Sequence, residues 1–277
     1  MKKRTLTNIA LLLVAAGLAA FIASLPEGEN PSPLEPLSHE NPRAVSHLRL
    51  ELGEDRIIEL RRDDGKWRLV APLNIAANDF RIDALLRVLQ APVYARIAVD
   101  ADELGRFGLA HPRARALLDD TEILFGDIEA INGRRYLLYH GQVALVDDRY
   151  FSHLSSSAAN YVDPALLAGR PGLRSIALPK FRIYRDADRW RVDPDDGSMS
   201  ADDISALAEA WRNTQATAVR SLEPSLPWRD EVVIELTDES VHFDVAHTKY
   251  EVILGRRDLA IQYHLTKATG ARLLGAR

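Results

Sequence analysis

The sequence predicts an α+β protein in which an N-terminal single transmembrane helix precedes two tandem, related α+β domains, each made of antiparallel hairpins and one amphipathic helix. Three features predict this architecture: an uncharged apolar stretch near the N-terminus, strand patterns followed by helical stripes, and the return of these features about 122 residues later. The expected boundaries are residues 1–25 for a cytoplasmic stub and membrane anchor, 26–43 for a tether, 44–170 for the first domain and 171–277 for the second.

The composition is that of a folded chain, because 47% of the 277 residues are apolar and 27% are charged. Cysteine is absent, which excludes disulfides, thiolate metal sites and a cysteine nucleophile. Without Lys2, Lys3 and Arg4, the 35 cations fall to 32 against 40 acids, so the region beyond the apolar stretch is acidic. We therefore expect no nucleic-acid binding, which depends on a basic face that neutralises phosphates.

The membrane anchor is predicted at residues 9–25, which carry no charge and end before Pro26. A helix of this length spans about 25 Å, close to the ~30 Å hydrocarbon core of a bilayer. Because the cations precede this stretch, the positive-inside rule places the N-terminus in the cytoplasm and the bulk of the chain in the periplasm of a bacterium, as a single-pass inner-membrane protein. A cleaved signal peptide is the alternative, but Phe21 and Leu18 stand where small residues would precede a cleavage site.

The tether is predicted from five prolines between residues 26 and 42, a composition that stays extended. Beyond it, leucines at every second position of residues 48–52 predict a half-buried strand, and another strand is expected at residues 56–60. Asp63-Asp64-Gly65 predicts a tight turn into a third strand at residues 66–70. Asn78 is expected to cap a helix whose apolar stripe is Ile82, Leu85, Leu86 and Leu89.

The same order returns in the second half of the chain. Phe181 and Ile183 predict a strand, residues 186–188 a turn, and Trp190 a returning strand. Ser200 and Asp203 form a capping-box pattern before a second amphipathic helix. Its stripe is Ile204, Leu207, Ala208 and Trp211, at an offset of 122 from the first helix.

The repeat is expected to continue after each helix. Residues 123–126 resemble residues 252–255, and residues 136–138 resemble residues 263–265, with offsets of 129 and 127. These pairings predict equivalent strands in the two copies.

Several segments of the first copy are similar to one bacterial protein family. They are residues 65–69 with Pro72, Leu85-Leu86, residues 104–109 with Pro112, residues 123–126 and residues 136–146. Together they resemble domain-of-unknown-function family 4340, over about residues 46–155 and more loosely in the second copy. The resemblance implies an exported, inner-membrane-anchored protein associated with ABC-type transport systems, and it brings no catalytic residues.

Catalytic and binding motifs are weak in this sequence. The P-loop, dinucleotide-binding, nucleophile-elbow and zincin patterns are absent, and no cofactor is expected. His242 and Asp244 are candidate metal ligands on one face of a strand, although an exposed strand face shows the same pattern, and His247 has the opposite parity. Residues 193–197 resemble a calcium loop only in part, and Asp147, His153 and Ser155 have the residue types of a triad without its setting.

Trp67 and Trp190 lie at matching places in the two hairpins, where they are expected to pack against the helices or to line a ligand groove. The sequence thus predicts a membrane-anchored periplasmic accessory or binding protein without catalytic activity, with a protein partner in an ABC-type transport or envelope complex. A periplasmic hydrolase or metal-dependent enzyme is the alternative.

Overall fold

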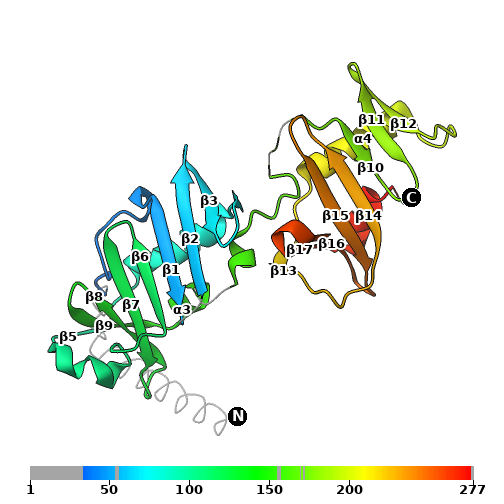
Figure 1. Cartoon of the computed structure of the whole chain (residues 1–277). Helices are drawn as coiled ribbons and strands as arrows, with labels where there is room; N and C mark the ends of the chain where they lie inside the picture. The colour runs from blue at the N-terminus through cyan, green and yellow to red at the C-terminus, as the bar shows by residue number, and fades with distance from the viewer. Residues whose placement is uncertain (1–33, 54–55, 155–156, 169, 171, 276–277) are drawn as a thin grey trace, which may run out of the picture. The chain divides into compact units, whose positions relative to one another are not determined.

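The computed structural model describes residues 34–53, 56–154, 157–168, 170 and 172–275, and these residues form two antiparallel β-sheets (Figure 1). Seventeen strands make up the sheets, whereas the four α-helices of the described chain are short, the longest having 13 residues. The predicted α+β class is therefore wrong, and the protein is β-rich. The prediction failed because the hairpins of each copy join into one sheet of nine or eight strands, which outweighs the few short helices.

The predicted membrane span at residues 9–25 lies outside the described residues. In the described part of the chain, no helix combines the length and the apolar character needed to cross a bilayer. The end of the predicted tether is described, and there the buried Leu37 donates its backbone N–H to the carbonyl of Ala91 at 2.8 Å.

The first sheet has nine strands in the order β4-β3-β2-β1-β6-β7-β8-β9-β5, with every neighbouring pair antiparallel. The strands are β1 His47–Leu52, β2 Arg56–Asp63, β3 Lys66–Ala71, β4 Ile75–Ala76, β5 Ala95–Ile97, β6 Ala114–Leu118, β7 Thr121–Ile128, β8 Arg134–Tyr139 and β9 Gln142–Asp147. The predicted hairpin turn is confirmed, since Asp64 and Gly65 both have positive φ between β2 and β3.

The second sheet has eight strands in the order β12-β11-β10-β14-β15-β16-β17-β13. They are β10 Ser175–Ala177, β11 Arg182–Asp186, β12 Arg189–Asp193, β13 Ala218–Ser221, β14 Trp228–Glu235, β15 Ser240–His247, β16 Glu251–Arg256 and β17 Ile261–Thr266. Apart from β4, this order repeats that of the first sheet, with β1 matching β10 and β9 matching β17. The two halves therefore share one strand topology.

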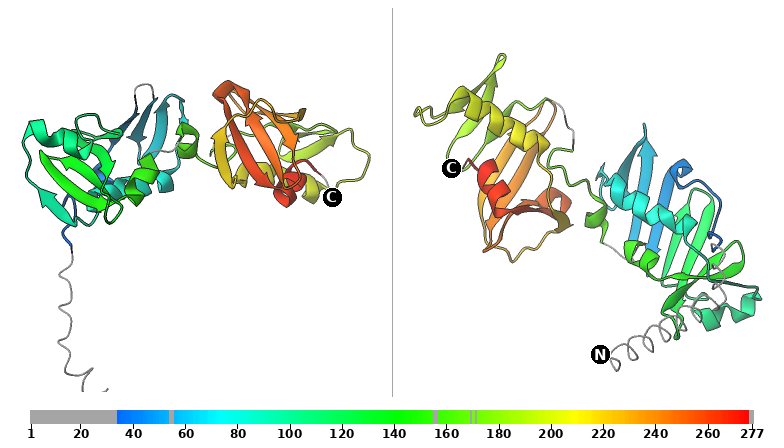
Figure 2. Two further views of the ribbon diagram at one scale, coloured as in Figure 1. Left: turned by 90° about the horizontal axis from the view of Figure 1, so that it is seen from below. Right: turned by 180° about the vertical axis from the view of Figure 1, so that it is seen from behind.

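One face of each sheet carries helices (Figure 2). The first sheet has α2 Asp79–Leu86, the 3₁₀ helix η2 Arg87–Gln90 and α3 Arg149–Leu154, and the second has α4 Ala201–Asn213 and α5 Lys267–Leu273. The predicted caps are confirmed: the Asn78 side chain accepts from the N–H of Arg81, and Ser200 forms a capping box with Asp203. Every residue of both predicted stripes is buried, so apolar periodicity located the two faces correctly.

The predicted pairing of the later strands is wrong by one strand. Residues 123–126 belong to β7 and residues 252–255 to β16, but the shared topology matches β7 with β15 and β8 with β16. The error arose because the first copy has an additional 3₁₀ helix, η3 Ala101–Phe107, between β5 and β6. Because the first copy is longer here, the difference in residue number between equivalent strands becomes smaller after the helices. The apolar strands resemble one another locally, so the sequence did not reveal this change.

The face of the first sheet opposite the helices is covered at one end by the segment around η3. Leu109, Leu124 and Val143 form a small second core there, and the rings of Phe107 and Tyr136 meet edge to face at 4.9 Å. Gly126 permits this contact, because a Cβ at that position would lie 2.2 Å from the carbonyl oxygen of Phe107. The second sheet uses a similar arrangement, in which Trp228 and Leu222 cover Gly255.

Replacing Gly126 by alanine is expected to reduce the free energy of unfolding by about 1–3 kcal/mol, because the added methyl overlaps a backbone oxygen that cannot move away alone. Urea denaturation of the variant measures the loss. Gly105→Ala is the matched control, since no heavy atom lies within 4 Å of the added carbon at that position. Equal stability of the two variants would contradict the close approach of η3 to β7.

Candidate functional site

The two candidate metal ligands lie on the outer face of β15, opposite the core. His242 Nδ1 is 2.9 Å from Glu231 Oε1 on β14, and the carboxylate of Asp244 forms an ion pair with Arg257. The predicted alternation along this strand is confirmed, because Val241, Phe243 and Val245 are buried on the other face. The structure thus places both candidates in separate ion pairs.

His247 and the calcium-like loop are also in local contacts. His247 Nε2 lies 4.0 Å from Asp230 Oδ2. In the loop, Asp195 accepts from the N–H of Gly197 and Asp196 from the N–H of Ser198, as in Asx turns. Among the residues that the structure describes, no group of three or more His, Asp and Glu side chains is placed to hold a metal ion.

The two tryptophans occupy matching strands but different environments. Trp67 on β3 is only 2% exposed and belongs to the core, with the Arg62 guanidinium 4.6 Å from its ring centroid. Trp190 on β12 also packs against the main apolar core, but it is only partly buried. This difference between equivalent residues shows that the second hairpin is less covered than the first.

The triad-like residues are not brought together as a described group, because Ser155 lies outside the described residues. Asp147 accepts from the backbone N–H of Arg149 at 2.9 Å, and the carbonyl of His153 accepts from the hydroxyl of Tyr161. The pKa of His153 is lowered, mainly by burial and further by nearby arginines, of which Arg81 has the largest effect. This imidazole therefore favours its neutral form.

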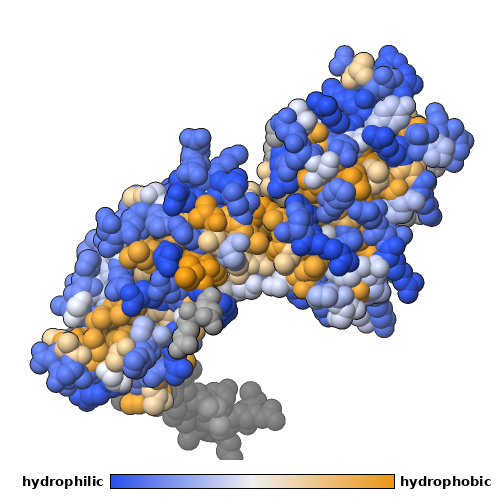
Figure 3. Space-filling model, viewed as in Figure 1, coloured by the Kyte–Doolittle hydropathy of each residue, from blue (hydrophilic) through white to orange (hydrophobic). Residues whose placement is uncertain are grey.

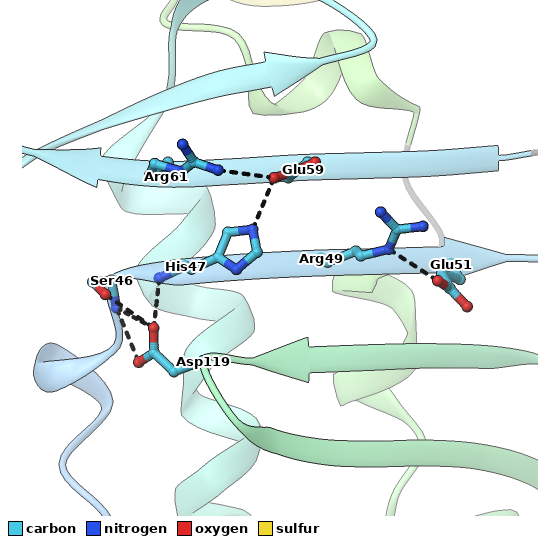
Figure 4. Close-up of polar contacts among 7 residues, drawn as sticks. All are labelled: Ser46, His47, Arg49, Glu51, Glu59, Arg61 and Asp119. Atoms are coloured by element: carbon cyan, nitrogen blue, oxygen red, sulfur yellow. Dashed lines mark hydrogen bonds and ion pairs between the residues drawn. The ribbon is translucent and has the colours of Figure 1, made fainter.

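Polar side chains form ion pairs on the outer face of β1 and β2 (Figure 4). Glu59 contacts both His47 and Arg61, and Arg49 Nε donates to Glu51 at 2.9 Å. At the end of β1, the Asp119 carboxylate accepts from the backbone N–H groups of Ser46 and His47. These contacts satisfy charged groups on an exposed sheet face, where each pair contributes little to stability.

Large apolar side chains are exposed at two equivalent hairpin ends, which the sequence did not lead us to expect. Residues 129–133 join β7 to β8 and residues 248–250 join β15 to β16; we call these segments the first and second tips. Ile131 in the first tip is 87% exposed and Tyr250 in the second is 72% exposed. Because β7 matches β15 and β8 matches β16, the same place in both copies presents a large apolar side chain to solvent.

Both tips are held by local hydrogen bonds. Glu129 accepts from the N–H groups of Ile131 at 3.0 Å and Asn132 at 2.8 Å, and the pKa of Glu129 is lowered, chiefly by the bond from Asn132. In the second tip, Thr248 Oγ1 accepts from the N–H of Tyr250 at 3.3 Å. The exposed side chains therefore extend from ordered turns, which lowers the entropy lost on binding.

These tips were not predicted from the sequence. The available signal was an apolar residue within a turn between two strands, but the strands on either side had not been matched correctly between the copies. The surface seen in Figure 3 is largely hydrophilic, with several apolar areas between the hydrophilic residues.

The topology and surface define a class of protein: a tandem repeat of antiparallel β-sheet units with apolar side chains exposed at matching hairpin ends. The chain belongs to the family described as Domain of unknown function (DUF4340), whose sequence pattern matches residues 67–227. The match begins later than the expected residue 46 and extends from β3 through β13, so it includes parts of both sheets. No curated protein and no solved structure matches the chain.

Lowering the pH from 7 to 5 is expected to destabilise the protein partly through His153. Its pKa is lower in the folded chain than in the unfolded chain, so the unfolded state binds the proton more readily, and stability is lost as the pH falls below about 6.5. Thermal melts at both pH values should show a smaller decrease in the melting temperature for His153→Gln than for the wild type. An identical decrease in both proteins would contradict the lowered pKa of this half-buried imidazole.

Proposed function

We propose that this protein is a non-catalytic accessory subunit that binds a protein partner through its two hairpin tips. The observation that carries the proposal is the exposure of Ile131 and Tyr250 at equivalent positions of two repeated sheets. A large apolar side chain on an ordered turn is a typical anchor for a protein interface, because it loses little conformational freedom on binding and buries a large area.

The surroundings of the tips support a protein partner. Lys249 Nζ lies 5.1 Å from the ring centroid of Tyr250, and Glu129 and Arg134 flank Ile131. An apolar anchor surrounded by charged groups resembles the centre and the rim of a protein interface. The candidate metal ligands His242 and Asp244 each have an ion-pair partner, which favours protein binding over a metal-dependent activity.

The location and partner are part of the proposal. The uncharged residues 9–25 attach the chain to the bacterial inner membrane and the two sheets lie in the periplasm. Family resemblance supports an ABC-type transport or cell-envelope complex as the partner. Two tips on one chain would increase the affinity for such a complex, because the second contact becomes intramolecular after the first.

The proposal predicts that the double variant Ile131→Asp and Tyr250→Asp recovers less partner than the wild type. Tagged full-length protein is crosslinked in cells and purified from membranes, and the co-purified proteins are quantified by mass spectrometry. Because interface anchors often contribute more than about 2 kcal/mol, we expect a decrease of about tenfold or more.

Phe80→Asp is the matched control, since Phe80 is 76% exposed but belongs to α2 and to neither hairpin tip. This variant should recover the partner at the wild-type level, and circular dichroism should be the same for all three proteins. Undiminished recovery by the double variant would reject the tips as the binding surface. Recovery of no transport or envelope protein by the wild type would reject the proposed partner.

A further inference from the structure

The two sheets share one strand order but differ at one edge. In the first sheet, β3 is followed by β4, which pairs Ile75 with Leu69 and Ala76 with Arg68. In the second sheet, β12 matches β3 and is the edge strand (Figure 1). The second copy therefore lacks the strand that covers this position in the first.

The covering of β3 involves both its backbone and its side chains. The carbonyl of Trp67 accepts from the N–H of Ala77 at 3.0 Å, and the N–H of Trp67 donates to the Asp79 carboxylate at 3.2 Å. Beneath β4, Trp67 is 2% exposed and Leu69 is fully buried. Both backbone groups of Trp67 that point away from β2 thus have partners within the chain.

The equivalent groups of β12 have no such covering. Met199 matches Ala77 by the offset of 122, yet no backbone hydrogen bond joins Met199 to Trp190, both of which are described. Ala201 stands in place of Asp79, so the acceptor for the tryptophan N–H is missing as well. Trp190 and Val192 remain only partly buried against the core.

The backbone of β12 is oriented to accept another strand. A two-residue turn joins β11 to β12, and Asp186 pairs with Arg189 at its base. Because hydrogen-bonded pairs alternate with non-hydrogen-bonded pairs along an antiparallel ladder, the N–H and C=O groups of Trp190 and Val192 point away from β11. Unpaired groups of this kind on an edge strand are a template for pairing with another chain.

The sequence of β12 is complementary to itself in the antiparallel direction. With Arg191 at the centre, Trp190 faces Val192 of a second copy, and Arg189 faces Asp193 of that copy. Each of these two contacts occurs twice, related by a two-fold axis, as an isologous interface requires. Arg191 faces itself, but Asp186 partly offsets its charge, since Arg191 Nε donates to Asp186 Oδ2 at 2.6 Å.

We propose that β12 pairs antiparallel with β12 of a second copy of this chain, joining the two second sheets into one continuous sheet. The pairing makes hydrogen bonds between Trp190 of each copy and Val192 of the other. It also covers Trp190 and Val192, whose equivalents in the first copy lie beside β4. This interface uses the sheet edge and not the hairpin tips, so it stands independently of the proposed partner binding.

The experiment uses the absence of cysteine from the chain. In Arg191→Cys, the two new thiols would belong to a non-hydrogen-bonded pair with Cα atoms about 4.5 Å apart, within the range for a disulfide. Full-length protein in detergent, mildly oxidised at micromolar concentration, should form disulfide-linked dimer. The matched control is Arg68→Cys, the equivalent position on the covered strand β3, where we expect about tenfold less dimer under the same conditions.

A second variant tests the backbone pairing without a thiol. Val192→Pro removes an N–H that points away from β11, so the β11–β12 ladder remains while the pairing with a second copy is lost. Light scattering should show dimer for the wild type and monomer for this variant, with unchanged circular dichroism. Equal crosslinking of Arg191→Cys and Arg68→Cys, a monomeric wild type, or crosslinking of Arg191→Cys to a different protein only would each overturn the proposal.

Discussion

The fold depends on the burial of one apolar face of each long antiparallel sheet under short helices. The stripes of α2 and α4 supply that burial, and Trp211 on α4 is held in place by a hydrogen bond from its indole N–H to the carbonyl of Leu273 at 2.8 Å. Helices of eight and 13 residues are too short to cover a whole sheet. The opposite face of each sheet carries no helix of this kind. Its side chains are instead paired with each other, as around β1, or covered by chain segments, as over Gly126 and Gly255.

This constraint explains where apolar side chains remain exposed. Charged residues on the outer faces are largely used to satisfy one another, as His242 with Glu231 and Asp244 with Arg257 illustrate. Apolar side chains remain exposed at the hairpin ends and are only partly buried at the edge of the second sheet. These apolar side chains are the basis of the proposed protein contacts.

The two copies share one topology but differ in whether the edge beside the first hairpin is covered. The first copy supplies its own covering strand, with Ile75 over Leu69 and Asp79 accepting from Trp67. The second copy replaces these features with an Asp- and Gly-containing loop and with Ala201. A few substitutions beside a common hairpin thus change a closed edge into an open one, because backbone groups at an edge need partners wherever water is excluded.

The sequence by itself determined the local structure: the turn at Asp64 and Gly65, the caps at Asn78 and Ser200, and the buried stripes of both helices. These depend on periodicity and on contacts between residues close along the chain. It did not reveal the β-rich class, the match of β7 with β15 or the exposure of Ile131 and Tyr250. Only the tertiary structure decided these, because strand pairing and edge position depend on hydrogen bonds between residues far apart in sequence, which no local pattern specifies.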